Sequence, residues 1–134
     1  MFETIHPNFD VLSSQPGARR AKILTLQSAF TWIPPEYLLF IEQQTELELQ
    51  HKDGQYVRIW EPSGCVEMNE GYGITARIPG SFPFGDDGGG RVLHYQGTNG
   101  IYLVGYGSLN AEDSVFVAPS LQALLINETG IDKF

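Results

Sequence analysis

Cysteine is nearly absent from this chain, since Cys65 is the only one among 134 residues. A single cysteine excludes an internal disulfide framework and a zinc site of clustered cysteines, so Cys65 is expected to be a small buried apolar residue. The sequence also lacks a long apolar run, and its first residues lack the basic and then apolar pattern of a signal peptide. We therefore expect a soluble cytoplasmic protein that does not enter a membrane.

Basic residues are scarce as well. Eight lysines and arginines stand against sixteen aspartates and glutamates, which gives a formal net charge of −8. Ten of the acids and only three of the bases lie between Glu36 and Asp87, so this span carries −7 of the total. Such a field repels nucleic acid and attracts a basic protein, although a net charge of this size is also common in small soluble domains.

The residue sets that carry catalysis are missing too. The three histidines, His6, His51 and His94, belong to no metal-binding helix motif, and no serine lies in a nucleophile elbow. His6 falls in an irregular segment, His51 beside a hairpin turn is expected to face solvent, and His94 in an apolar strand is expected to be hydrogen-bonded. The glycine-rich stretches lack the other residues of a phosphate-binding loop. We therefore expect no enzyme, no cofactor and no metal ion.

Periodicity predicts an α+β fold in a single domain, residues 1–134, in which residues 1–17 form an irregular N-terminal arm. The predicted helices are Ala18–Phe30, one that begins at Pro35 and Glu36, a short one from Pro62 to Met68, and one capped by Ser120. The predicted strands are Glu46–Gln50, Tyr56–Trp60, the end of a loop-and-strand segment Asn69–Ile78, Val92–Tyr95, Ile101–Val104 and Ser114–Val117. Asp-Gly and Asn-Gly pairs between strands predict hairpins. We expect a central twisted antiparallel β-sheet, with helices from the N-terminal third and the C-terminus packed on it.

The stretch from Pro79 to Gly90 joins an aromatic run to two adjacent acids and three consecutive glycines. Consecutive glycines are expected where the backbone needs positive φ or close approach. The carboxylates of Asp86 and Asp87 can accept hydrogen bonds from N–H groups two residues on. We favour a tight, self-bonded corner between two strands over a docking surface for a cation or a basic partner. The following glycines supply no further carboxylates at the spacing of a calcium loop.

Several motifs follow one another in an order that is typical of one family. They are Ile33-Pro34-Pro35-Glu36-Tyr37 followed by Phe40-Ile41, Val66-Glu67 followed by Asn69-Glu70 and Tyr72, the corner from Phe84 to Gly90, Ile101-Tyr102, and Ala118 to Leu125. With these motifs the chain, over about residues 33–125, resembles the SUKH superfamily of fungal cell-wall-assembly regulators and bacterial immunity proteins. It departs from the family where the first core helix ends, since Gln43-Gln44-Thr45-Glu46 replaces the usual Asn-Gly-Gly.

The resemblance implies an α+β fold with a twisted antiparallel sheet and no catalysis. Bacterial members are largely thought to bind and neutralise a cognate protein toxin, so the resemblance implies a non-enzymatic immunity protein. The acidic middle of the chain then predicts a basic toxin domain as the partner, bound by acids and by aromatic anchors. The predicted partner-binding residues are Trp60, Glu61, Glu67, Glu70, Tyr72, Phe84, Asp86 and Asp87.

Two other functions stay open at this point. One is an intracellular regulatory scaffold that binds an endogenous protein, by analogy with the cell-wall-assembly regulators. The other, which we favour less, is a small cation-dependent enzyme. The chain is expected to be a monomer or a weak homodimer, because Leu47–Gln50 could pair with its own copy as an edge strand, whereas its glutamates oppose such pairing.

Overall fold

The computed structural model describes residues 4–134, and this part of the chain forms one antiparallel sheet in which each strand pairs with its neighbours in sequence. The strands are β1 (Phe9–Pro16), β2 (Gln44–His51), β3 (Tyr56–Ile59), β4 (Ser81–Asp86), β5 (Arg91–Gln96), β6 (Ile101–Gly105) and β7 (Val115–Ala118). The helices are α1 (Arg20–Ala29), α2 (Pro35–Gln43), α3 (Pro62–Tyr72), α4 (Ile74–Arg77) and α5 (Leu121–Asn127), with 3-10 turns η1 (Tyr106–Ser108) and η2 (Ile131–Lys133). The predicted α+β fold with an antiparallel sheet is confirmed.

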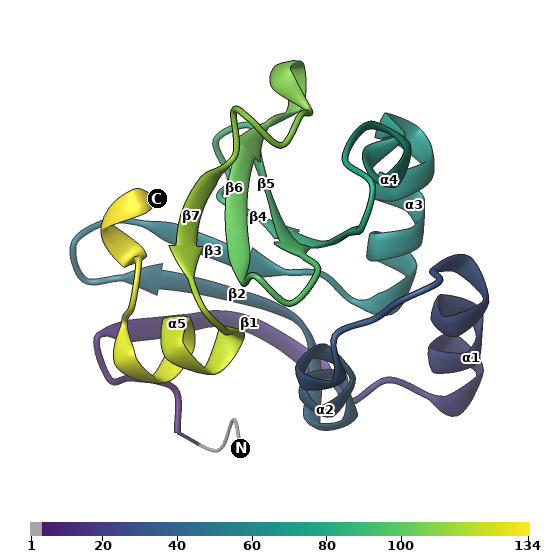
Figure 1. Cartoon of the computed structure of the whole chain (residues 1–134). Helices are drawn as coiled ribbons and strands as arrows, with labels where there is room; N and C mark the ends of the chain where they lie inside the picture. The colour runs from purple at the N-terminus through teal and green to yellow at the C-terminus, as the bar shows by residue number, and fades with distance from the viewer. Residues whose placement is uncertain (1–3) are drawn as a thin grey trace.

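The sheet turns sharply between its third and fourth strands. In Figure 1, β1, β2 and β3 run across the view, whereas β4, β5, β6 and β7 stand nearly upright. Strands β3 and β4 share the register pairs Arg58–Asp86 and Ile59–Gly85, which is a short junction. Helices α3 and α4 contact β4, α2 contacts β2 and α5 contacts β7. None of the helices in residues 4–134 is long and apolar enough to cross a bilayer.

Helix α2 supplies much of the core. Proline in its first turn and Glu36 beside it are favourable at a helix start, as the sequence predicts. Its apolar face buries Tyr37 and Phe40 completely, and the Tyr37 ring lies 5.0 Å from the Phe82 ring. The Tyr37 hydroxyl donates to the carbonyl of Trp60 at 2.7 Å, which satisfies the polar end of this buried ring.

Local turn and cap signals in the sequence are confirmed. The Asp53-Gly54 pair joins β2 to β3, with φ of 104° at Gly54, a value that glycine adopts without steric cost. Asn99-Gly100 joins β5 to β6 in the same manner, with φ of 117° at Gly100. At α5, the Ser120 hydroxyl accepts a hydrogen bond from the Ala123 N–H at 3.0 Å.

The prediction of an irregular N-terminal arm over residues 1–17 is wrong for residues 9–16, which form β1. Residues 1–3, which the same prediction covers, lie outside the described part of the chain. Strand β1 pairs with β2 over its whole length but buries only Phe9 fully, so it lacks the alternation of apolar residues that reveals a strand. Because β1 occupies the outer edge, β2 lies inside the sheet, and Leu47–Gln50 is not an edge strand that could pair with a second copy.

The prediction that Asn69–Ile78 is a loop followed by a strand is also wrong. Helix α3 continues to Tyr72 and ends at Gly73, which adopts φ of 63° and donates its N–H to the Asn69 carbonyl. Helix α4 follows directly. Two glycines in this segment hide the helical pattern, and the contacts of α3 and α4 with β4 stabilise the helices despite them.

Candidate functional site

The turn between β4 and β5 is held by its own two aspartates. Asp86 Oδ1 accepts from the Gly88 N–H, and Asp87 Oδ1 accepts from the Gly89 N–H, both at 2.8 Å. Asp87 also accepts from the Arg91 N–H at 3.0 Å and from Arg91 Nε at 2.7 Å. Burial raises the pKa of Asp87, but the hydrogen bonds from Gly89 and Arg91 outweigh it and hold that pKa below its ordinary value. The structure therefore confirms a self-bonded corner.

Asp86 also ties this turn to β3. Its Oδ2 accepts a hydrogen bond from Trp60 Nε1 at 2.7 Å, and Arg58 is its register partner in the sheet. Arg58 in turn forms an ion pair with Glu46, whose second carboxylate oxygen accepts the backbone N–H of Glu61 at 2.8 Å. The backbone of Glu46 adopts φ of 48°, a left-handed conformation that residues other than glycine rarely take. The carboxylates of Asp86 and Glu46 are thus already engaged within the fold and are not free to bind a partner.

A second part of the site lies on and just before α3, and its carboxylates do not bond to other parts of residues 4–134. Glu67 and Glu70 are exposed and lie three residues apart on the helix, which places them on one side of it. Glu67 lines a depression of about 440 Å³ together with Glu61, Glu46 and Arg58. Within residues 4–134, the carboxylates of Glu61, Glu67 and Glu70 form no ion pair or hydrogen bond. Their charges therefore remain available to a cation from outside.

Two tyrosines meet at the C-terminal end of α3. The rings of Tyr72, at the end of α3, and Tyr106, after β6, lie 4.5 Å apart, and Tyr72 is 44% exposed. The Tyr106 backbone N–H donates to the Gly90 carbonyl at 3.1 Å, so Tyr106 adjoins the β4–β5 turn. Burial and then the negative charge of Asp86 raise the pKa of Tyr106. We call the residues Glu61, Glu67, Glu70, Tyr72 and Tyr106 the acidic face. It combines unpaired carboxylates with an aromatic pair that a partner can cover.

The structure corrects two of the predicted partner-binding residues. Trp60 is only 3% exposed and Phe84 is fully buried, so neither ring can anchor a partner at the surface. Both residues flank acids in the sequence, which favours a surface position, but the Phe84 ring lies 6.3 Å from the core ring of Tyr37. The role of Arg58 is not visible in the sequence, because it depends on the register of Arg58 with Asp86 on the neighbouring strand.

The lone cysteine is buried, as predicted. Burial raises the pKa of the Cys65 thiol to about 12, and its sulfur lies 3.1 Å from the Tyr37 hydroxyl. A thiol with so high a pKa carries almost no thiolate near neutral pH. Cys65 therefore acts as a core residue rather than as a nucleophile.

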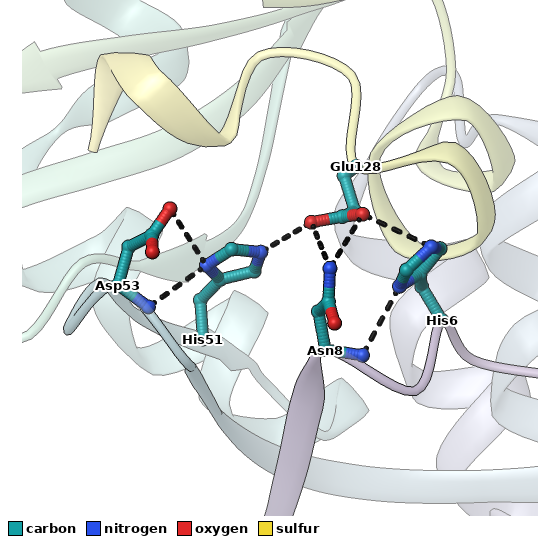
Figure 2. A network of polar contacts seen from close by, with 5 residues as sticks. All are labelled: His6, Asn8, His51, Asp53 and Glu128. Carbon is teal, nitrogen blue, oxygen red and sulfur yellow. Dashed lines mark hydrogen bonds and ion pairs between the residues drawn. The ribbon is translucent and has the colours of Figure 1, made fainter.

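A separate polar network joins the two ends of the described chain to the β2–β3 hairpin (Figure 2). At its centre the Glu128 carboxylate accepts from Asn8 Nδ2 at 3.0 Å, from His6 Nε2 at 3.0 Å and from His51 Nε2. His6 Nδ1 accepts a hydrogen bond from the Asn8 backbone N–H, and His51 Nδ1 accepts one from the Asp53 backbone N–H. The proton of each neutral imidazole is therefore on Nε2, which donates it to Glu128. The network has the geometry of a structural clasp.

The expectation that His51 faces solvent is wrong. Strand β2 turns Leu47, Leu49 and His51 to the same inner side, and His51 is 3% exposed. Its ring also packs edge-on against Phe9, with 5.1 Å between the ring centres. The hydrogen bond from His51, and next that from Asn8, holds the pKa of Glu128 below its ordinary value.

Replacing Glu128 by glutamine is expected to lower the melting temperature at pH 7, because the amide nitrogen would take the place of one oxygen and face two donors, Asn8 Nδ2 and the Nε2 atom of one histidine. A carboxyl with a depressed folded pKa stabilises the fold above its unfolded pKa of about 4.5 and loses this effect as pH falls through the lower folded pKa. The gap between the wild type and Glu128→Gln should therefore shrink from pH 5 towards pH 3, as thermal melts would measure. Asp132→Asn, at an exposed acid nearby, is the control and should change little. Equal melting temperatures of Glu128→Gln and wild type at pH 7 would exclude a stabilising clasp.

Within residues 4–134, no three side chains among histidine, cysteine, aspartate and glutamate are arranged to hold a metal ion. Comparison with models of known protein families gives no match to this chain, and neither does a search of the curated proteins.

Proposed function

We propose that this chain is a non-enzymatic protein-binding module that uses the acidic face to bind a basic protein. The observation that carries this proposal is the set of carboxylates on and before α3 that have no partner within residues 4–134, on the helix that ends with the exposed Tyr72 ring. The resemblance to the SUKH superfamily in its motifs supports a narrower form of the proposal. In that form the partner is a protein toxin, and this chain is a bacterial immunity protein.

Binding would proceed by electrostatic attraction followed by burial of aromatic surface. Unpaired carboxylates at Glu61, Glu67 and Glu70 attract a basic partner and raise the association rate, an effect that salt screens. Tyr72 and Tyr106 then lose contact with water, which slows dissociation. A partner held in this way has its own basic surface covered, so a nuclease or similar toxin would lose access to its negatively charged substrate.

The test needs acids whose replacement leaves the fold intact, which excludes Asp86 and Asp87. The double variant Glu67→Lys/Glu70→Lys reverses the charge at two exposed residues that form no ion pair. The matched control is Glu42→Lys/Glu112→Lys, which changes the net charge by the same amount at two other exposed acids. Tagged protein would be used to isolate partners from the native source with a salt gradient, and affinity would then be measured with the purified partner.

The expected result is a loss of affinity of at least about tenfold in Glu67→Lys/Glu70→Lys at low salt, and a much smaller loss in the control. The difference should narrow as salt increases. Equal losses in both variants would show that only the net charge matters, and no loss would reject the acidic face. A toxin encoded beside this chain's gene would support the immunity role, whereas a housekeeping protein would favour a regulatory scaffold.

A further inference from the structure

An uncharged groove lies at the end of the β4–β5 ladder that is opposite to the Asp86–Gly90 turn. Three small depressions of about 250, 270 and 290 Å³ meet there. The depression of about 250 Å³ shares Trp32 with that of about 270 Å³ and Pro79-Gly80 with that of about 290 Å³. The three therefore adjoin one another, and we call them together the track. Residues of the α1–α2 connection line one side of the track, and residues of the segment that leads from α4 into β4 line the other.

The lining of this groove differs from the rest of the surface. All its residues lie in the described part of the chain, and none of them carries a charge, although the whole chain has 24 charged residues. Trp32 contributes to two of the depressions and is 36% exposed. Phe30, which precedes it, packs edge-on against Phe82 at 4.8 Å and so fixes the start of the α1–α2 connection on β4. An exposed indole is therefore supported by the core.

Two polar groups without partners lie side by side in this groove. Ser81 and Gln96 are register partners at the end of the β4–β5 ladder, so their side chains emerge on the same face of the sheet. Ser81 is 95% buried, and its Oγ has no hydrogen-bond partner in residues 4–134; the same holds for the buried Nε2 of Gln96. Buried polar groups normally have hydrogen-bond partners, and each one left without a partner lowers the stability of the fold. Ser81 lines the depression of about 250 Å³, and Gln96 lines that of about 290 Å³.

We propose that this groove binds a neutral carbohydrate, with the Trp32 indole as the stacking platform and Ser81 Oγ and Gln96 Nε2 as hydrogen-bonding groups. Sugar rings present an apolar face to an aromatic side chain and hydroxyl groups to donors and acceptors. The absence of charge in the groove matches an uncharged ligand, because a charged one would lose its hydration without gaining a partner. Ligand sites commonly combine aromatic walls with a few placed polar groups in this way.

The dimensions of the groove favour a sugar over a peptide or protein partner. Stable protein interfaces need roughly 1,000 Å² or more of buried surface, whereas each depression here is small and separate from the acidic face. A chain of linked rings could place successive rings along the track. This site is independent of the acidic face, so either proposal can fail alone.

The test is a titration with three uncharged hexasaccharides: β-1,3-linked glucose, β-1,4-linked glucose and β-1,4-linked N-acetylglucosamine. Tryptophan fluorescence reports directly on the site, because Trp60 is buried and hydrogen-bonded to Asp86, whereas Trp32 is exposed. At least one of the three sugars is expected to give a saturable change. In Trp32→Ala, affinity measured by calorimetry should fall by at least about tenfold.

The variant Ser81→Ala distinguishes a role of the hydroxyl in sugar binding from a role in the stability of the fold. Removal of an unpartnered hydroxyl should leave the melting temperature unchanged or raise it, while sugar affinity falls several-fold. Thr98→Ala, at an exposed position in the β5–β6 turn outside the groove lining, is the control and should bind as the wild type does. The proposal is overturned if none of the three sugars binds at millimolar concentration, or if Trp32→Ala binds them as tightly as the wild type.

Discussion

Acidification from pH 6.5 to about pH 4 is expected to cost the fold about 3 kcal/mol of unfolding free energy through one side chain, His94. His94 lies in β5 and is fully buried, with Nε2 3.2 Å from the Ser114 hydroxyl and no partner for Nδ1 in residues 4–134. Burial disfavours the imidazolium ion and lowers the pKa of His94 from 6.5 to about 4.

The direction of the effect follows from proton uptake. In the unfolded chain His94 binds a proton near pH 6.5, whereas in the folded chain it does so only near pH 4. Between these values the unfolded state holds the additional proton, so stability falls as pH decreases. Above pH 6.5 both states are neutral at this residue, and the effect is absent. The depressed pKa values of Asp87 and Glu128 add acid sensitivity only below about pH 5, at the lower end of this range.

Urea unfolding of wild type and His94→Phe between pH 4.5 and 7.5 would measure this effect. Phenylalanine retains an aromatic ring beside Tyr102, whose ring lies 6.0 Å from that of His94, and it cannot take up a proton. The loss of stability from pH 6.5 to 4.5 should be much smaller in the variant than in the wild type. An equal loss in both proteins would show that groups other than His94 cause the acid sensitivity.

Replacement of Gly85 by alanine is expected to lower the unfolding free energy by about 3 kcal/mol. A Cβ at this position would lie 2.2 Å from the carbonyl oxygen of Arg58 on the neighbouring strand. The obstacle is backbone, so it cannot rotate away as a side chain would. Since Gly85 forms one of the register pairs that join β3 to β4, the clash would separate the two parts of the sheet at their junction.

The matched control is Gly107→Ala, since an added Cβ there meets nothing within 4 Å and the residue is exposed. That variant should be within about 0.5 kcal/mol of the wild type. Urea midpoints with equal m-values would compare the two variants. The predicted shift at Gly85 should also weaken the Trp60–Asp86 hydrogen bond, which near-ultraviolet circular dichroism of the tryptophan would report. A Gly85→Ala protein as stable as the control would contradict the tight junction.

The sequence alone predicted the elements whose signals are local. Pro35 and Glu36 mark the start of α2, the Asp53-Gly54 and Asn99-Gly100 pairs mark two hairpins, and Ser120 marks the start of α5. Each of these signals depends on one or two neighbouring residues and on steric or hydrogen-bonding preferences that hold in any fold. The acids on α3 that form the acidic face could be selected for the same reason, since charge is visible in the sequence.

Only the tertiary structure decided which of these groups remain free. Trp60 and Phe84 flank acids in the sequence but face the core, and Asp86 accepts a hydrogen bond from Trp60, the residue after β3. The pairing of Ser81 with Gln96 depends on strand register, and β1 is a strand because β2 supplies its hydrogen bonds. Burial and register are set by residues distant in the chain. The sequence therefore determined the local elements and the amount of charge, and long-range packing determined which side chains a ligand can reach.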